Sequence, residues 1–144
     1  MKKVLFLCTG NSCRSQMAEG WARALLGSQV ESYSAGTDSH GLNPLAVRAM
    51  AACGVDISQH SSKTLDSLSE IRFDLIVTVC DNAASSCPTA PDGGRVIHVP
   101  FDDPPWLAKD AKTEEEATKH YLRVRDEIRE FVLTLPSFLE VSSR

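Results

Sequence analysis

A short apolar strand, a polar loop of five residues and a helix follow one another at the start of this chain. The strand is predicted at residues 3–7 and runs into Cys8, and the helix is predicted at residues 14–26 and opens with Arg14. The five residues between the thiol and the guanidinium can wrap around a tetrahedral oxyanion, with their amide groups turned inward. Such a strand–loop–helix unit is typical of a parallel sheet covered by helices.

The residue types in this loop predict an anion pocket with a nucleophile at its base. Arg14 can present a two-pronged donor to an oxyanion, and the N-terminus of the helix adds partial positive charge. The same positive field stabilises a thiolate on Cys8, which makes Cys8 the expected nucleophile. Gly10 suits a tight or positive-φ position. The residues expected to bind the oxyanion are Thr9, Gly10, Asn11, Ser12, Cys13, Arg14 and Ser15.

Strand and helix patterns alternate along the rest of the chain, with no internal repeat or long linker. Further strands are predicted at residues 30–34, 74–79 and 95–99, and further helices at residues 44–53 and 65–70, before a long last helix that a capping box of Thr113 and Glu116 opens. This alternation predicts one α/β domain over residues 1–144, a Rossmann-like four-stranded parallel sheet with helices on both faces. Ligands of such sheets bind beyond the carboxyl ends of the strands.

Two aspartates, Asp102 and Asp103, follow the fourth predicted strand at this edge of the sheet. A departing oxide or alkoxide needs a proton, which a carboxyl group can donate. Pro104 and Pro105 stiffen the loop that would present the acid. We predict Asp103 as the general acid and keep Asp102 as the alternative; both could instead be solvated loop residues.

Cys80 ends the third predicted strand, and six residues with little to anchor a core separate it from Cys87. Cys80 could attack a sulfur–substrate bond at Cys8, and Cys87 could then take over Cys80 and carry the disulfide outward. The alternatives are two structural thiols or half of a zinc site. We predict the redox relay and no metal site, because zinc ligands are usually closer in sequence and the histidines are scattered: His40, His60, His98 and His120.

The composition argues against several partners and compartments. The formal net charge is −4 and no basic run occurs, so neither a nucleic acid nor a membrane partner is expected. The apolar run before Cys8 is shorter than the roughly 7–15 residues of an export signal. A cytoplasmic monomer is therefore expected, with reduced cysteines. Cys53 and Trp21 are expected in the core, Cys13 is structural or an occasional false partner for Cys8, and Trp106 is left open as a lid or a partner contact.

These motifs together resemble thioredoxin-coupled arsenate reductases, which are built on the low-molecular-weight protein tyrosine phosphatase fold. The resemblance covers nearly the whole chain. It rests on the run Cys-Thr-Gly-Asn-Ser-Cys-Arg-Ser-Gln-Met-Ala-Glu-Gly from Cys8 to Gly20, on Tyr33-Ser34-Ala35-Gly36, on Asn43-Pro44, on Val77-Thr78-Val79-Cys80 with Cys87-Pro88, and on Phe101-Asp102-Asp103-Pro104.

The resemblance implies that arsenate is reduced to arsenite, in arsenic detoxification and without a cofactor. Cys8 would attack arsenate held by the loop and Arg14, while Asp103 would protonate the leaving oxygen. Cys80 would attack the Cys8–arsenic adduct and release arsenite, leaving a Cys8–Cys80 disulfide. Cys87 would then form an exposed Cys80–Cys87 disulfide for thioredoxin to reduce. Glutathione with glutaredoxin, or another low-molecular-weight thiol, is the alternative electron donor.

Some members of this group bind potassium near the loop, through residues that match Asn11, Glu19, Ser34 and an aspartate. This chain has Lys63 at the last of these positions. A lysine ammonium can take the place of the cation, so no specific potassium site is expected.

The alternative function is that of a low-molecular-weight protein tyrosine phosphatase, because arsenate and phosphate esters are both tetrahedral oxyanions. Phosphatases of this type usually carry proline where this chain has Gln16, lack the pair of Cys80 and Cys87, and often have tandem tyrosines where Pro105-Trp106 stands here. A third interpretation, a non-enzymatic oxyanion sensor, does not explain the combination of nucleophile, acid and relay thiols.

Overall fold

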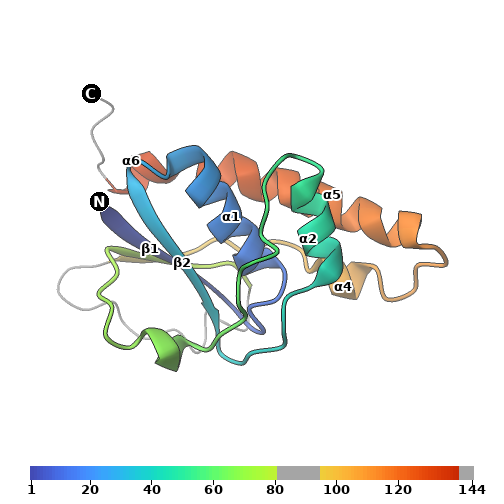
Figure 1. Cartoon of the computed structure of the whole chain (residues 1–144), viewed down its shortest axis with the longest axis horizontal. Helices are drawn as coiled ribbons and strands as arrows, with labels where there is room; N and C mark the ends of the chain where they lie inside the picture. The colour runs from blue at the N-terminus through green and yellow to red at the C-terminus, as the bar shows by residue number, and fades with distance from the viewer. Residues whose placement is uncertain (81–94, 140–144) are drawn as a thin grey trace.

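The computed structural model of the chain describes residues 1–80 and 95–139 (Figure 1). Strands and helices alternate through its first two thirds, and helices follow. In chain order they are β1 (Lys2–Cys8), α1 (Arg14–Leu26), β2 (Val30–Gly36), α2 (Pro44–Ala51), the 3-10 helix η1 (Leu65–Leu68), β3 (Leu75–Thr78), β4 (Arg95–His98), α4 (Pro104–Leu107), α5 (Glu114–Val132) and α6 (Leu135–Leu139).

The four strands form one parallel sheet in the order β2-β1-β3-β4. Residues 4–7 of the central strand β1 are fully buried, which explains their uninterrupted apolar run. Cys8 lies opposite Gly36 on β2, and Leu7 lies opposite Thr78 on β3. The carboxyl ends of these strands therefore meet at one edge, and the predicted parallel α/β sheet is confirmed.

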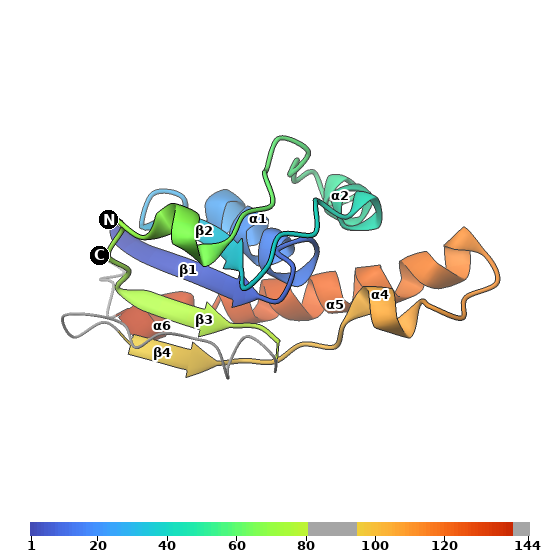
Figure 2. The same ribbon diagram turned by 90° about the horizontal axis from the view of Figure 1, so that it is seen from below.

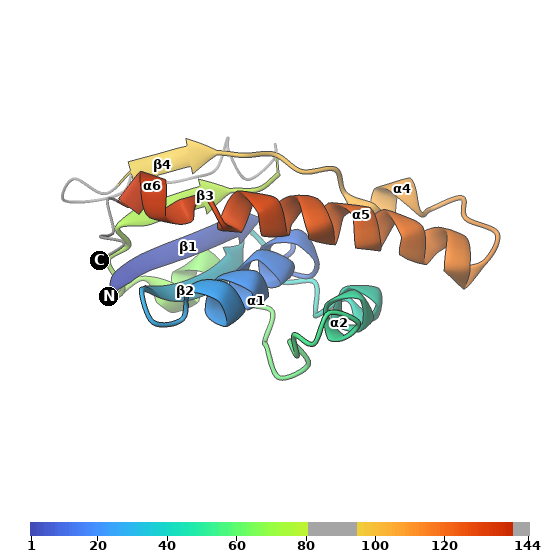
Figure 3. The same cartoon turned by 90° about the horizontal axis from the view of Figure 1, so that it is seen from above.

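Helices α1 and α5 lie side by side on one face of the sheet, with α2 packed against both (Figure 3). The short η1 lies on the opposite face (Figure 2). Trp21 on α1 is 4% exposed, and its indole N–H donates a hydrogen bond to the carbonyl of Arg125 on α5 at 3.0 Å. Trp21 is thus part of the core, as predicted, and joins the two helices that cover the sheet.

The long last helix begins where the sequence predicts. The hydroxyl of Thr113 accepts a hydrogen bond from the backbone N–H of Glu116 at 3.1 Å, which makes Thr113 the N-cap. The Glu116 carboxylate accepts from the N–H of Lys112 and not from that of Thr113, so the capping box is only half as predicted. The helix stops at Val132, and α6 follows, because the ring of Pro136 would clash with a continuing helix. Within the described residues, no helix is both long and apolar enough to cross a membrane.

Cys53 is exposed, so the prediction that it fills the core is wrong. Helix α2 ends at Ala51, before the predicted end at residue 53, and the chain turns at Gly54, whose φ is 80°. A glycine adopts this left-handed conformation without a steric penalty. The turn takes Cys53 off the apolar face that a longer helix would have extended.

Candidate active site

The loop between β1 and α1 forms one wall of a pocket of about 260 Å³. The pocket is lined by Cys8, Thr9, Gly10, Ser12, Cys13, Arg14, His40, Asp103 and Pro105. The two remaining residues predicted to bind the oxyanion, Asn11 and Ser15, are fully buried and do not line the pocket. Three segments that are distant in sequence thus build the site: the loop, the segment after β2 and the segment after β4.

The outer side of the loop is bonded to the segment that follows β2. The carbonyl groups of Cys8, Thr9 and Gly10 accept hydrogen bonds from the backbone N–H groups of residues 37, 38 and 40, at 2.8 to 3.1 Å. In a trans peptide the C=O group and the next N–H group point in opposite directions. The N–H groups that follow these carbonyls therefore point away from this segment, an arrangement that suits an oxyanion held inside the loop.

Cys8 lies at the base of the pocket with 3% of its surface exposed, and its sulfur is 2.9 Å from the hydroxyl oxygen of Ser15. Cys13 is equally buried. Burial raises the pKa of the Cys13 thiol far above its ordinary range; Cys8 raises it further, and Arg14 opposes this effect. Cys13 is therefore a neutral thiol at neutral pH, which suits a structural role and not that of a second nucleophile.

The guanidinium of Arg14 is held by the segment after β4. It donates a hydrogen bond from Nη1 to the carbonyl of Phe101 at 2.9 Å, and its Nη2 lies 3.6 Å from a carboxylate oxygen of Asp103. Asp103 lines the pocket, whereas Asp102 pairs with Arg123 on α5 at 2.9 Å. Of the two candidate acids, only Asp103 therefore faces the loop between β1 and α1, residues 8–14, which we call the anion loop after its predicted ligand.

Cys80 follows β3 and lies beside the anion loop. It is 3% exposed, and its sulfur is 3.3 Å from the hydroxyl oxygen of Thr9, the residue after Cys8. Cys8 and Cys80 are both free thiols. The second thiol of the predicted relay therefore lies against the residue that follows the first. Cys87, the third, lies outside the described residues.

His40 lines the pocket but was not among the predicted site residues. Its ring lies so close to Gly10 that a Cβ atom there would be 2.3 Å from Nδ1 of the histidine. The glycine lets the His40 ring lie against the loop, and the positive φ of the loop falls on Asn11, at 49°. The sequence carries no local signal for His40, because its place depends on how the segment after β2 packs against the loop.

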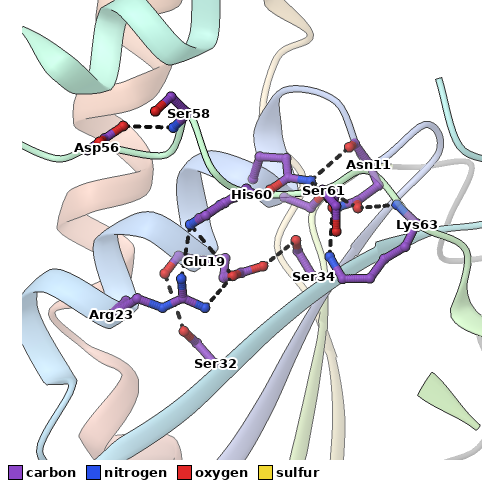
Figure 4. A network of polar contacts seen from close by, with 12 residues as sticks. Asn11, Glu19, Arg23, Ser32, Ser34, Asp56, Ser58, His60, Ser61 and Lys63 are labelled. Atoms are coloured by element: carbon purple, nitrogen blue, oxygen red, sulfur yellow. Dashed lines mark hydrogen bonds and ion pairs between the residues drawn. The ribbon is translucent and has the colours of Figure 1, made fainter. Parts of the chain in front are cut away.

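Behind the loop between β1 and α1, the buried carboxylate of Glu19 lies in a network of polar contacts that includes Ser34, and Asn11 and Lys63 belong to a neighbouring part of the same region (Figure 4). Glu19 accepts hydrogen bonds at 2.6 Å from the hydroxyl of Ser34 and from the guanidinium of Arg23. Lys63 lines the same pocket as Glu19 and Arg23. Burial lowers the pKa of Lys63, Glu19 raises it and Arg23 lowers it.

Glu31, the other carboxylate that lines this pocket, lies 3.8 Å from the ammonium of Lys3. Each carboxylate of the pocket thus has cationic neighbours within the chain, so these residues do not fit a potassium ion.

Comparisons with known proteins agree with this arrangement. A family model described as low molecular weight phosphotyrosine protein phosphatase matches residues 3–135. An arsenate reductase of Bacillus subtilis (strain 168) is 52% identical over 127 residues, 88% of this chain and 89% of that protein. An arsenate reductase of Halalkalibacterium halodurans is 49% identical over 133 residues, 92% of this chain and 94% of that protein.

The fold leads to the same group of proteins. A solved structure of an arsenate reductase in the phosphate binding state has a TM-score of 0.73 and 29% sequence identity, covering 99% of this chain and 100% of that chain. The resemblance drawn from the motifs is therefore confirmed in both sequence and fold. The chain belongs to the low-molecular-weight phosphotyrosine protein phosphatase family.

Proposed function

We propose that this chain reduces arsenate to arsenite by a reaction of three cysteines, Cys8, Cys80 and Cys87. One observation carries the proposal: a buried thiol, a guanidinium and a carboxylate line one anion pocket, and a second thiol lies against the loop that forms it. The two arsenate reductases named above, which share about half of their residues with this chain, support the choice of substrate.

In the first step, the Cys8 thiolate attacks the arsenic of arsenate bound in the loop. A sulfur–arsenic bond replaces an arsenic–oxygen bond, and the displaced oxygen leaves as water. The loop N–H groups and Arg14 stabilise the negative charge that develops on the remaining oxygens. Asp103, which faces the same pocket, donates a proton to the leaving oxygen.

In the second step, Cys80 attacks the sulfur of Cys8. The electron pair of the sulfur–arsenic bond stays with arsenic, which leaves as arsenite, and a Cys8–Cys80 disulfide forms. Two thiols have then supplied the two electrons that the reduction needs. Cys87 attacks Cys80, which frees Cys8 and leaves a Cys80–Cys87 disulfide that cytoplasmic thioredoxin reduces.

The test follows arsenate-dependent NADPH oxidation by the purified chain with thioredoxin and its reductase, beside a reaction with glutathione and glutaredoxin. We expect sustained turnover with thioredoxin. Cys8→Ser is expected to abolish it, because the variant has no thiolate to attack arsenic. No oxidation with either donor would refute arsenate reduction, and turnover with glutaredoxin alone would refute the coupling to thioredoxin.

Hydrolysis of a phosphotyrosine ester is the second candidate, favoured by the family match. It would need Cys8, Arg14 and Asp103 but no second cysteine. Cys80→Ser separates the two functions: a phosphatase keeps its rate on p-nitrophenyl phosphate in this variant, whereas an arsenate reductase loses multiple turnover with thioredoxin.

A further inference from the structure

We propose that His40 is a further anion-binding residue of this pocket, and that its protonated ring supplies positive charge to a bound tetrahedral oxyanion. The ring lines the same pocket as Cys8, Arg14 and Asp103. The inference rests on the proposed function in one respect, namely that this pocket takes an oxyanion such as arsenate. It goes beyond that function because it makes the affinity of the pocket depend on the charge of a histidine.

The backbone of residues 40 and 41 is bonded to the anion loop. The N–H of His40 donates to the carbonyl of Gly10 at 2.9 Å. A second connection runs through Ser62, whose hydroxyl donates to the same carbonyl at 3.0 Å and accepts from the N–H of Gly41 at 3.2 Å. The histidine is therefore fixed to the loop that would surround the anion, and its ring lines the pocket without any rearrangement of the chain.

The two nitrogens of the His40 ring have different surroundings. A Cβ atom at residue 10 would lie 2.3 Å from Nδ1, so this edge of the ring lies against the backbone of Gly10. Nε2 lies 3.4 Å from a carboxylate oxygen of Asp38, a residue that does not line the pocket. Asp38 thus contacts the ring from outside the pocket. The side chain of His40 is 55% exposed, so the ring can take up a proton from solvent.

The charges that line the pocket do not favour a divalent anion while His40 is neutral. Among the residues of the described part of the chain that line it, only Arg14 and His40 have basic side chains. The Arg14 guanidinium lies 3.6 Å from a carboxylate oxygen of Asp103, and the proposed Cys8 thiolate adds a further negative charge. With Asp103 ionised, one cation therefore faces two anions. Protonation of His40 balances them, which favours a negatively charged ligand.

The chain as a whole does not attract anions, because its formal net charge is −4. Positive charge for an oxyanion must therefore come from groups at the pocket itself. Histidine is the side chain whose charge ordinarily changes between pH 5 and 8. Since the protonated ring is the form that helps binding, the affinity for an oxyanion should rise as the pH falls through this range.

Five other ionisable groups face the ring: Asp38 on its own segment, Cys8, Cys13 and Arg14 on the anion loop, and Asp103 after β4. Arg14 keeps its charge at every pH of the test. Burial keeps Cys13 a neutral thiol by raising its pKa. Asp38 lies outside the pocket and is exposed to solvent. A test of the histidine must therefore separate it from Cys8 and from Asp103.

The experiment titrates the Cys8→Ser protein with sulfate by isothermal calorimetry, at pH 5.5 and at pH 8.0 with constant ionic strength. Sulfate is a divalent tetrahedral anion at both pH values, so the ligand does not titrate. The serine removes the thiolate, so the titration of Cys8 does not contribute. We expect the dissociation constant of sulfate to be about three- to tenfold lower at pH 5.5 than at pH 8.0.

Two substitutions of His40 in this background distinguish an effect of charge from a structural effect. His40→Gln has no ionisable ring, and we expect its two dissociation constants to agree within about twofold. His40→Lys is positively charged at both pH values, and we expect its constants to agree equally well. The lysine variant should bind sulfate more tightly than the glutamine variant at pH 8.0. Equal losses in both variants at both pH values would show a structural role and overturn the inference.

Asp103→Asn and His120→Gln are the control variants, again in the Cys8→Ser background. Asp103→Asn removes the other side chain of the pocket that could take up a proton as sulfate binds. His120 lies on α5 and does not line the pocket. We expect both controls to keep the pH dependence of the Cys8→Ser protein.

A pH dependence that persists in His40→Gln or disappears in Asp103→Asn would overturn the inference, as would the absence of sulfate binding at both pH values. None of these measurements uses arsenate or a reductant. Failure of arsenate reduction beside pH-dependent sulfate binding would count against the proposed function alone. Arsenate reduction beside sulfate binding that does not depend on pH would count against the role of His40 alone.

Discussion

The side chain of Arg14 is held in position by a segment 87 residues further along the chain. Its guanidinium donates to the carbonyl of Phe101 and faces Asp103, so the strand that precedes this segment sets the position of this arginine, which is predicted to bind the anion. Asp102, one residue earlier, points to Arg123 on α5. Neighbouring carboxylates thus have different surroundings, and only one of them can serve the pocket.

Asp103→Asn should slow the reaction of Cys8 with arsenate by roughly 100- to 10,000-fold, because the amide cannot donate a proton as a carboxylic acid does. Binding of phosphate, measured by calorimetry, should change little. Asp102→Asn is the matched control and should lose no more than a few-fold in single-turnover rate. If Asp102→Asn is the slow variant, the assignment of the acid is wrong by one residue.

The buried thiol of Cys13 predicts how the free energy of unfolding depends on pH. Its folded-state pKa is raised above the ordinary value of 9.0, so its contribution to stability is complete at lower pH and is lost as the pH rises. Above pH 9 the free energy of unfolding should fall by up to about 1.4 kcal/mol per pH unit from this group. Urea unfolding under reducing conditions at pH 8 to 10 measures the slope. Cys13→Ala should show a shallower slope, and equal slopes would contradict the prediction.

At the scale of the elements, α5 is the helix that packs against α1 across the face of the sheet (Figure 3). Its buried stripe includes Tyr121, Val124, Ile128 and Val132, at three- and four-residue steps. At its N-terminus, the hydroxyl of Thr113 accepts a hydrogen bond from the N–H of Glu116, and three acidic residues occupy the first turn. The start of the helix is thus encoded locally, whereas its packing depends on α1.

Thr113→Ala should lower the free energy of unfolding by about 1 kcal/mol, because the N–H of Glu116 loses its acceptor. Thr118→Ala is a matched control in the same helix, since its hydroxyl only donates to a helix carbonyl, that of Glu114. That variant should be neutral or slightly stabilising. Chemical denaturation of both proteins measures the difference, and equal midpoints would show that the cap contributes nothing.

At the scale of the whole molecule, the parallel sheet gathers groups that the sequence separates. The residues that end or follow β1, β3 and β4 meet at one edge, which brings Cys8, Cys80 and Asp103 to the same loop. Behind that loop, the negative charge of Glu19 has two cationic side chains of the same chain nearby, Arg23 and Lys63. The proposed relay and the expected indifference to potassium therefore depend on contacts that only the assembled fold provides.

Cys87→Ser should permit at most about one turnover with thioredoxin, because the Cys8–Cys80 disulfide has no third thiol to resolve it. Mass spectrometry of the trapped protein should find Cys8 joined to Cys80, with one arsenite released per chain. Sustained turnover of this variant would rule out the relay through Cys87.

Exchange of potassium for sodium at constant ionic strength should leave both the rate and the thermal midpoint unchanged, because Arg23 and Lys63 already supply positive charge near Glu19. The measurement is a pair of salt titrations, each followed by activity and by thermal unfolding. A strong stimulation or stabilisation by potassium alone would contradict the prediction.

The sequence by itself determined the parallel α/β sheet, the anion loop with Cys8 and Arg14, and the cap of the last helix. These features depend on residues that are close together in the chain: an apolar run, a five-residue loop, and a threonine three positions before a glutamate. Local patterns of this kind indicate strands, loops and helix starts from neighbouring residues alone.

Only the tertiary structure decided which aspartate faces the pocket, that His40 lines it and that Cys53 is exposed. Each of these depends on a contact or a turn that no local sequence pattern indicates. The hydrogen bond from Arg14 to the carbonyl of Phe101 is an example, because it joins residues far apart in the chain. A side chain is aimed by the packing of the elements around it. For that reason the candidate site residues could be predicted from the sequence, but the directions in which their side chains point could not.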